Sequence, residues 1–239
     1  MTTLMLLSGL NCDAAVWAPQ VAGLQSEAQC VIPAWGLRDS LTAMAEQVLQ
    51  EAPSERFNLA GHSMGGRVAL EVMRLAPQRV ERLALLDTGT QALASGEVGE
   101  KERAGRMALL ELARAQGMRA MGRQWARGMV HPDRIDTPVF EAVLDMLERG
   151  SVAQFEAQIK ALLDRRDATP LLGGVTCPTL VLTGRQDSWS TPAQHQAMAA
   201  ALPQAELRIV EDCGHMCTME QPRQLSDALR QWLARPLTA

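Results

Sequence analysis

The sequence predicts an α/β fold with a mostly parallel central sheet and helices on both of its faces. Six short apolar runs, each bounded by Gly, Pro or polar residues, alternate with longer stretches of helical periodicity. Alternating strands and helices favour a parallel sheet, because each crossover helix covers one face of it. Two runs, at residues 83–86 and 179–182, are apolar at nearly every position, as is typical of strands buried on both faces.

The expected strands follow one another at residues 3–8, 29–33, 56–60, 82–86, 178–183 and 206–210. After the third, Val68, Val72 and Leu75 recur at three- and four-residue intervals before Pro77, which predicts an amphipathic helix. No internal repeat or low-complexity tract interrupts this order.

The alternation stops between the fourth and fifth expected strands. That stretch reads as helices separated by Gly117, Gly122, Gly128, Pro132, Pro138 and Gly150. We therefore expect one domain, with a core at residues 1–90 and 170–239 and a helical lid insertion at residues 91–169.

Composition excludes several classes of function. The chain of 239 residues is 47% hydrophobic and 21% charged with a net charge of −4, which gives no electrostatic basis for binding nucleic acid. Its five cysteines are scattered and odd in number, which favours reduced thiols in the cytoplasm. The Cys213 and Cys217 pair has no second pair to complete a metal site, so no metal and no cofactor are expected. The first apolar stretch is too short to span a membrane and lacks the features of a targeting segment.

A candidate nucleophile lies between the third strand and the helix that follows it. Gly61-His62-Ser63-Met64-Gly65 is a GxSxG sequence in the strand, turn and helix context that this motif requires. A tight turn there projects the Ser63 hydroxyl above the sheet, and glycines are needed where strand and helix come together. The helix N-terminus also favours negative charge beside the serine.

A serine hydroxyl needs a base, and the chain contains four histidines. His215 follows the last expected strand, at the carboxyl edge of the sheet where ligands collect in open α/β folds. His62 lies inside the turn, His131 in the insertion and His195 on an expected helix. We therefore expect His215 to be the base, as against a structural histidine.

The base needs a carboxylate that orients its imidazole. Asp187 follows the fifth expected strand and gives the chain order Ser, Asp, His. Asp87, directly after the fourth strand, is the alternative, and Asp212 would need a loop reversal to reach His215. For the oxyanion we expect two backbone N–H donors, from Met64 and from Leu10 in the loop after the first strand.

These motifs together resemble the α/β-hydrolase family. The resemblance rests on the elbow at residues 61–66, on Gly184-Arg185-Gln186-Asp187, and on Gly214-His215 followed by Glu220-Gln221-Pro222, and it runs from about Leu4 to Leu233. The stretch from Leu6 to Trp17 is similar to the serine carboxylesterase and lactonase branch, including the pimeloyl carrier-protein methyl esterase and the oxoadipate enol-lactonases.

Three departures from the family pattern stand out. Ser8-Gly9 replaces the usual His-Gly of the oxyanion loop, so different hydrogen bonds must hold that loop. Residues 35–40 replace the usual Gly-x-Gly-x-Ser loop. The first expected strand is already the oxyanion strand, so we expect the two antiparallel edge strands of many members to be missing, which leaves about six strands, all parallel.

The resemblance implies a serine hydrolase that cleaves a carboxylic ester, thioester or lactone through an acyl-enzyme on Ser63. A carbon–carbon bond hydrolase or a cofactor-free peroxidase on the same triad, or an inactive ligand-binding member of the fold, are the alternatives. The expected partner is a small-molecule acyl substrate, whose identity the sequence leaves open, as it does the oligomeric state.

One cluster of charge lies in the insertion. Arg119, Arg123 and Arg127 recur every four residues, and residues 95–134 hold eight basic against five acidic residues. One interpretation is a solvated helix face whose arginines keep it soluble. The other is a surface that docks an acyl substrate borne by an acidic carrier.

Overall fold

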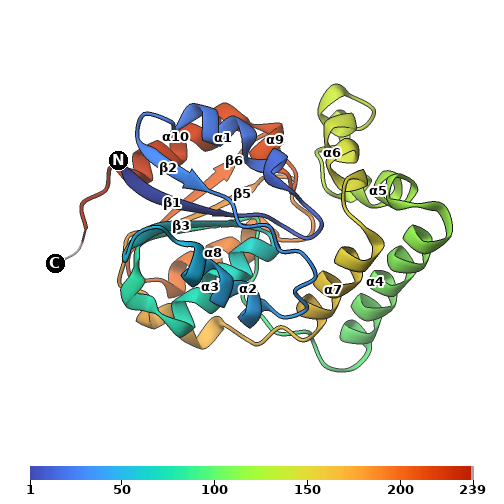
Figure 1. The fold of residues 1–239 in the computed structure, drawn as a ribbon, viewed down its shortest axis with the longest axis horizontal. Helices are drawn as coiled ribbons and strands as arrows, with labels where there is room; N and C mark the ends of the chain where they lie inside the picture. Colours follow the sequence, from blue (N-terminus) through green and yellow to red (C-terminus); the bar gives the residue numbers. More distant parts are fainter. Residues whose placement is uncertain (238–239) are drawn as a thin grey trace.

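The computed structural model describes residues 1–237 and shows one six-stranded sheet in the order β2-β1-β3-β4-β5-β6, with every neighbouring pair parallel (Figure 1). The strands are β1 Thr2–Leu7, β2 Ala28–Val31, β3 Phe57–His62, β4 Val80–Leu86, β5 Thr179–Gly184 and β6 Ala205–Val210. The predicted fold class, including six parallel strands, is confirmed.

Helices cover both faces of the sheet (Figure 1). One face carries α1 (Ala18–Gly23), α9 (Cys217–Glu220) and α10 (Pro222–Leu233), and the other carries α2 (Leu41–Glu51), α3 (Met64–Leu75) and α8 (Pro192–Ala201). Successive strand residues point to opposite faces, so Leu4 and Leu6 belong to one apolar cluster while Met5 and Leu7 belong to the other. This is why residues 83–86 of β4 and residues 179–182 of β5 are apolar at nearly every position.

The strand order indicates where in the fold a ligand-binding site is expected. The chain runs from β1 outward to β2, then returns across β1 to form β3, so the direction of winding reverses between β1 and β3. In open α/β sheets ligands bind outside the carboxyl ends of the strands at this switch point. The loop after β1 and the turn after β3 therefore lie side by side, and these are the two segments that carry Leu10 and Ser63.

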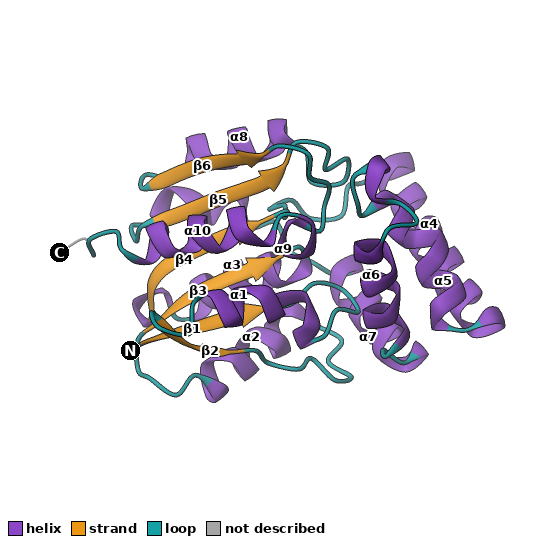
Figure 2. Cartoon of the chain, turned by 90° about the horizontal axis from the view of Figure 1, so that it is seen from above, coloured by secondary structure: helices purple, strands orange, loops and turns teal. Residues whose placement is uncertain are grey.

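Four α-helices lie between β4 and β5, and no strand occurs between residues 87 and 178. They are α4 (Gly96–Gln116), α5 (Met118–Trp125), α6 (Pro138–Glu148) and α7 (Val152–Leu163). Figure 2 shows them beyond the carboxyl ends of the strands, on the side where the sheet arrows point. No described helix is long and apolar enough to cross a membrane.

The helix breaks in this segment differ at one position from those expected. Gly117 has a φ of 86° and ends α4, as a residue in the left-handed region commonly does. Gly122, by contrast, lies inside α5, where a Cβ would come within 3.4 Å of the Leu147 side chain on α6. This glycine therefore permits two helices to pack closely and does not separate them.

Candidate active site

Ser63 lies in a strained turn between β3 and α3. Its φ of 56° and ψ of −118° are unfavourable for a residue with a side chain. A Cβ on Gly61 would lie 2.3 Å from the Gly65 carbonyl oxygen, and a Cβ on Gly65 would lie 2.0 Å from the Leu7 carbonyl oxygen. Both contacts are with backbone, which cannot move aside, so the close passage of β1, β3 and α3 requires glycine at both positions.

Three side chains from separate strand ends meet in a hydrogen-bonded chain. The Ser63 hydroxyl donates to His215 Nε2 at 2.8 Å, and His215 Nδ1 donates to Asp187 Oδ2 at 2.8 Å. The second carboxylate oxygen of Asp187 accepts the backbone N–H groups of Trp189 and Ser190, each at 2.9 Å. The Asp187 carboxylate is thus fixed from both sides, and the imidazole is held with a bare Nε2 that faces the serine.

The charges of this pair support each other. Burial opposes ionisation of His215, but the negative charge and hydrogen bond of Asp187 outweigh it and raise the pKa of His215 above its usual value. Burial would likewise raise the pKa of Asp187, yet the charge and hydrogen bond of His215 hold it below its usual range. The site is therefore built to stabilise an imidazolium beside an ionised carboxylate.

Asp87, the alternative acid, lies at the end of β4 and does not hydrogen-bond to His215. Its Oδ1 accepts the Gly184 N–H at 3.0 Å. Burial, followed by the negative charge of Asp187, raises the pKa of Asp87 to about 8. Asp212 has a φ of 51°, and its contacts run through its carbonyl oxygen, which accepts from Arg134 and Gln221. Neither residue takes the position that Asp187 occupies.

His62 and His195 both hydrogen-bond to backbone groups. His62 Nε2 donates to the His215 carbonyl oxygen at 2.7 Å, and burial, with the charge of His215 next, lowers the pKa of His62 to about 3. His195 accepts the Thr88 N–H at 3.2 Å through Nε2. His62 therefore supports the loop that carries His215, a role that its place in the elbow did not reveal.

The predicted oxyanion loop after β1 lies against Ser63. A Cβ on Gly9 would lie 3.3 Å from Ser63 Cβ, so the backbone just before Leu10 passes close to Ser63. Met64 is the first residue of α3, where its N–H has no intrahelical acceptor. Both predicted donors, Leu10 and Met64, also line the cavity above Ser63.

The unusual sequence of this loop is compensated by residues that are distant in the chain. Trp35 Nε1 donates to the Ser8 carbonyl oxygen at 3.0 Å. The Asn11 N–H donates to Gln158 Oε1 at 2.7 Å, and the Asn11 side chain donates to the Leu147 carbonyl oxygen at 2.9 Å. Two of the three departures from the family pattern, the Ser8-Gly9 loop and the loop at residues 35–40, thus contact each other through Trp35.

The insertion also supports the loop that carries His215. The Met129 carbonyl oxygen accepts the N–H of His215 at 2.7 Å and that of Met216 at 3.1 Å. Trp189 lies with its ring centroid 5.1 Å from His215 and stacks on Trp125 of α5 at 5.9 Å. No local pattern around these residues indicated either contact.

A cavity of about 800 Å³ opens above Ser63 and His215. Its walls come from α3, from α4 and α7 of the insertion, and from the loops after β4 and β5. Apolar side chains such as Leu109, Phe155 and Ile159 line part of it. The cavity is large enough for a small-molecule substrate whose reacting carbonyl lies at Ser63.

The arginine stripe of the insertion is divided. Arg119 forms ion pairs with three carboxylates of α6, those of Glu141, Asp145 and Glu148, at 2.7 to 2.8 Å. Its charge is therefore balanced, and Arg123 reaches Glu141 only at 3.7 Å. A docking role for the stripe thus depends on Arg123 and Arg127, and it stays a prediction.

The five cysteines are free, and Cys213 and Cys217 are buried. Burial raises the pKa of the Cys217 thiol well above its usual value. Within residues 1–237 no group of three or more His, Cys, Asp or Glu side chains is arranged to hold a metal ion.

The sequence model of the alpha/beta hydrolase family matches residues 4–228. The fold and this match together show that the chain belongs to the α/β-hydrolase family, as its motifs indicated, and hydrolase activity is its general function.

Individual proteins are similar over nearly the whole chain. An esterase from Thermogutta terrifontis, solved with malate bound, is 26% identical with a TM-score of 0.85, over 98% of this chain and 89% of that one. The enol-lactonase from Burkholderia xenovorans is 23% identical with a TM-score of 0.82, over 98% and 92%. A 2-hydroxy-6-oxononadienedioate/2-hydroxy-6-oxononatrienedioate hydrolase from Escherichia coli is 23% identical over 269 residues, 98% of this chain and 88% of that protein.

Proposed function

We propose that the protein is a serine hydrolase that cleaves a carboxylic ester, thioester or lactone through an acyl-enzyme on Ser63. The observation that carries this proposal is the continuous chain of two 2.8 Å hydrogen bonds from Ser63 through His215 to Asp187, at the floor of a cavity. Similarity to an esterase and to an enol-lactonase supports the ester-type bond.

In the proposed mechanism each group has one role. His215 Nε2 takes the proton as Ser63 Oγ attacks the substrate carbonyl, and Asp187 stabilises the imidazolium that forms. The N–H groups of Leu10 and Met64 donate to the oxyanion of the tetrahedral intermediate. His215 then returns the proton to the leaving alcohol or thiol. Water next attacks the acyl group on Ser63 while His215 takes its proton, and His215 returns that proton to Ser63 Oγ as the acid leaves.

Covalent labelling tests the acyl-enzyme directly. A fluorophosphonate should modify the wild-type protein at Ser63, as peptide mass mapping would show, and a chromogenic ester should release a burst of one equivalent. Ser63→Ala should prevent labelling and lower kcat by about 10⁶-fold, as loss of a triad nucleophile does. The exposed Ser26 is a matched control, since Ser26→Ala should keep both properties.

Labelling at another residue, or a tenth of the activity in Ser63→Ala, would contradict this mechanism. A vinylogous diketone cleaved faster than simple esters would instead assign the triad to carbon–carbon bond hydrolysis. A protein that binds esters but shows no burst would be an inactive member of the fold.

A further inference from the structure

The wall of the cavity above Ser63 carries an excess of positive charge. Among the residues that line it, Arg67, Lys101, Arg106 and Arg165 are basic, whereas Glu102 and Asp87 are acidic. The basic residues come from α3, from α4 and from the segment that follows α7. Elements far apart in the sequence thus bring several cations to one side of the substrate cavity.

A single carboxylate, that of Glu102, is shared between two of these arginines. Arg106 donates to its Oε1 at 2.9 Å, and the two terminal nitrogens of Arg165 donate to its two oxygens, each at 2.8 Å. Burial lowers the pKa of Arg106, although Glu102 lies beside it. One negative charge therefore serves two guanidinium groups.

Arg67 has no such partner. Its Nη1 donates to the Gln91 carbonyl oxygen at 2.8 Å, and in the described chain no carboxylate lies within 4.0 Å of its guanidinium. Burial, followed by the positive charges of Arg165 and Arg106, lowers the pKa of Arg67 to about 9. Gly89 leaves room for this group, because a Cβ there would lie 2.9 Å from Nη2.

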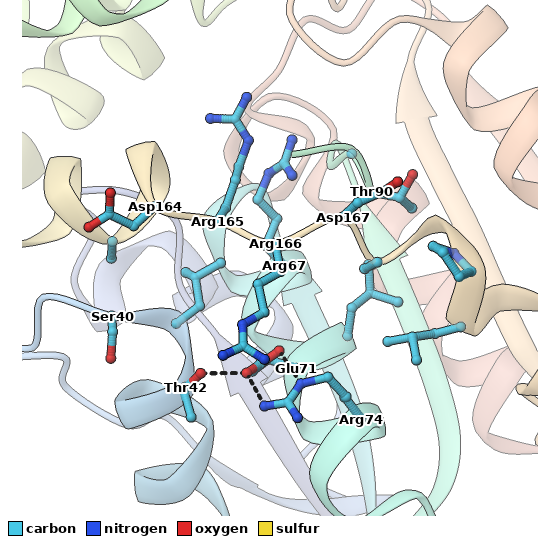
Figure 3. A pocket seen from close by; sticks show the side chains of 17 residues that line it. Ser40, Thr42, Arg67, Glu71, Arg74, Thr90, Asp164, Arg165, Arg166 and Asp167 are labelled. Atoms are coloured by element: carbon cyan, nitrogen blue, oxygen red, sulfur yellow. Dashed lines mark hydrogen bonds and ion pairs between the residues drawn. The ribbon is translucent and has the colours of Figure 1, made fainter. Parts of the chain in front are cut away.

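The next arginine along α3 shows the difference. Arg74 is outside the cavity wall and donates to both oxygens of Glu71, at 2.6 and 2.9 Å, while Thr42 donates to the same carboxylate (Figure 3). In that view Arg165 extends away from this group. The helix therefore carries one arginine that is neutralised and one, Arg67, whose charge is left for the cavity.

The carboxyl of Asp87 does not supply the missing charge at neutral pH. Burial raises its pKa to about 8, so the neutral acid predominates. Uncompensated cations in a partly desolvated cavity are unfavourable until an anion binds, and the guanidinium group matches the planar carboxylate in geometry.

We infer that Arg67, supported by Arg106 and Arg165, binds a carboxylate on the substrate, so that the preferred substrates are half-esters or thioesters of dicarboxylic acids. This inference rests on the proposed serine hydrolase function. The Arg67 N–H donates to the Ser63 carbonyl oxygen at 3.4 Å, so Arg67 lies about one turn into α3 from Ser63, about 6 Å along the helix axis. Both residues line the same cavity, so one dicarboxylic acyl group bound there can meet Ser63 at one end and Arg67 at the other.

Two esters with the same acyl chain test the inference. The 4-nitrophenyl half-ester of glutaric acid ends in a carboxylate, whereas 4-nitrophenyl valerate ends in a methyl group at the same position. The wild-type protein should prefer the glutarate ester in kcat/KM by about 10- to 100-fold, the range of a hydrogen-bonded charge pair. Arg67→Gln should reduce this preference to less than about threefold, and Arg67→Lys should retain part of it.

Binding without turnover gives a second measurement. Free glutarate should raise the melting temperature of Ser63→Ala but not that of Ser63→Ala combined with Arg67→Gln. Arg74→Gln, on the same helix, is the matched control and should keep the preference. If Arg67→Gln fails to fold by circular dichroism, Arg106→Gln takes its place.

The outcomes separate the two proposals. Hydrolysis of neither ester, or hydrolysis that survives Ser63→Ala, would overturn the proposed function. Ser63-dependent hydrolysis of the valerate ester with no preference for the glutarate ester, or a preference that Arg67→Gln leaves intact, would overturn the inference alone.

Discussion

Replacement of Asp187 by asparagine tests the arrangement at its most constrained point. One oxygen of Asp187 accepts from His215 Nδ1, and the other accepts two backbone N–H groups. If the NH₂ group of the asparagine faced those two backbone N–H groups, donors would face donors. The asparagine oxygen should therefore stay toward the backbone N–H groups, and the NH₂ group should face His215. His215 Nδ1 must then accept, which moves the ring proton to Nε2.

A proton on Nε2 prevents His215 from accepting the Ser63 proton. We therefore expect Asp187→Asn to lower kcat/KM by about 10⁴, which corresponds to about 5.4 kcal/mol of transition-state stabilisation. Steady-state hydrolysis of 4-nitrophenyl valerate measures the loss, and the rate of fluorophosphonate labelling should fall in parallel because it depends on the same proton transfer.

Asp87→Asn is the matched control, since Asp87 also ends a neighbouring strand but is largely protonated at neutral pH. An amide can keep the hydrogen bond that its Oδ1 accepts from Gly184. Its activity at pH 7 should remain within about fivefold of wild type, because an amide resembles a neutral acid in shape. The reasoning is refuted if Asp187→Asn stays within tenfold of wild type, or if Asp87→Asn is the variant that loses activity.

Three further outcomes follow from the structure. Because the pKa of His215 is raised and only the neutral ring accepts a proton, kcat/KM should rise with pH through a midpoint above about 6.5, and a flat profile between pH 5 and 8 would exclude a histidine base. Gly65→Ala should lower the melting temperature by at least about 4 °C, because the added Cβ would meet backbone atoms. The control Gly105→Ala, whose added Cβ would meet no atom within 4 Å, should raise the melting temperature slightly, and equal shifts would contradict the packing argument. The double variant Arg123→Gln, Arg127→Gln should have a higher KM than wild type for an acyl group on an acidic carrier, and high salt should likewise raise this KM for wild type. The KM for a neutral ester should change in neither case, and equal effects on both substrates would favour a solvated surface.

Much of the fold could be predicted because its signals are local. Apolar runs mark the strands, and Gly61 and Gly65 mark the point where strand and helix cross. Neither signal depends on contacts with distant segments of the chain. Chain order and strand ends were enough to bring Ser63, His215 and Asp187 forward as candidates. Asp87 remained an alternative because both aspartates end neighbouring strands, and only the tertiary structure distinguishes which one faces the imidazole.

Other parts of the site depend on contacts between distant segments. Trp35 holds the oxyanion loop from another loop, and no pattern around it indicates that role. The paired state of Arg119 depends on carboxylates of α6 that become its neighbours only after the helices pack. Arg67 lies in a helix that reads as ordinary amphipathic sequence, so its lack of a carboxylate partner could not be predicted.

The Met129 carbonyl oxygen limits how the insertion can be exchanged in protein engineering. Helical lids are attractive parts to graft between related enzymes, since they shape the cavity while the core carries the reacting groups. Here the His215 and Met216 N–H groups both donate to a backbone oxygen of the insertion, and a Cβ on Gly214 would lie 2.6 Å from the Val130 carbonyl carbon. A chimera must therefore reproduce the path of the chain at residues 129–130, and a graft chosen for its helices alone would leave the loop that carries His215 without its support.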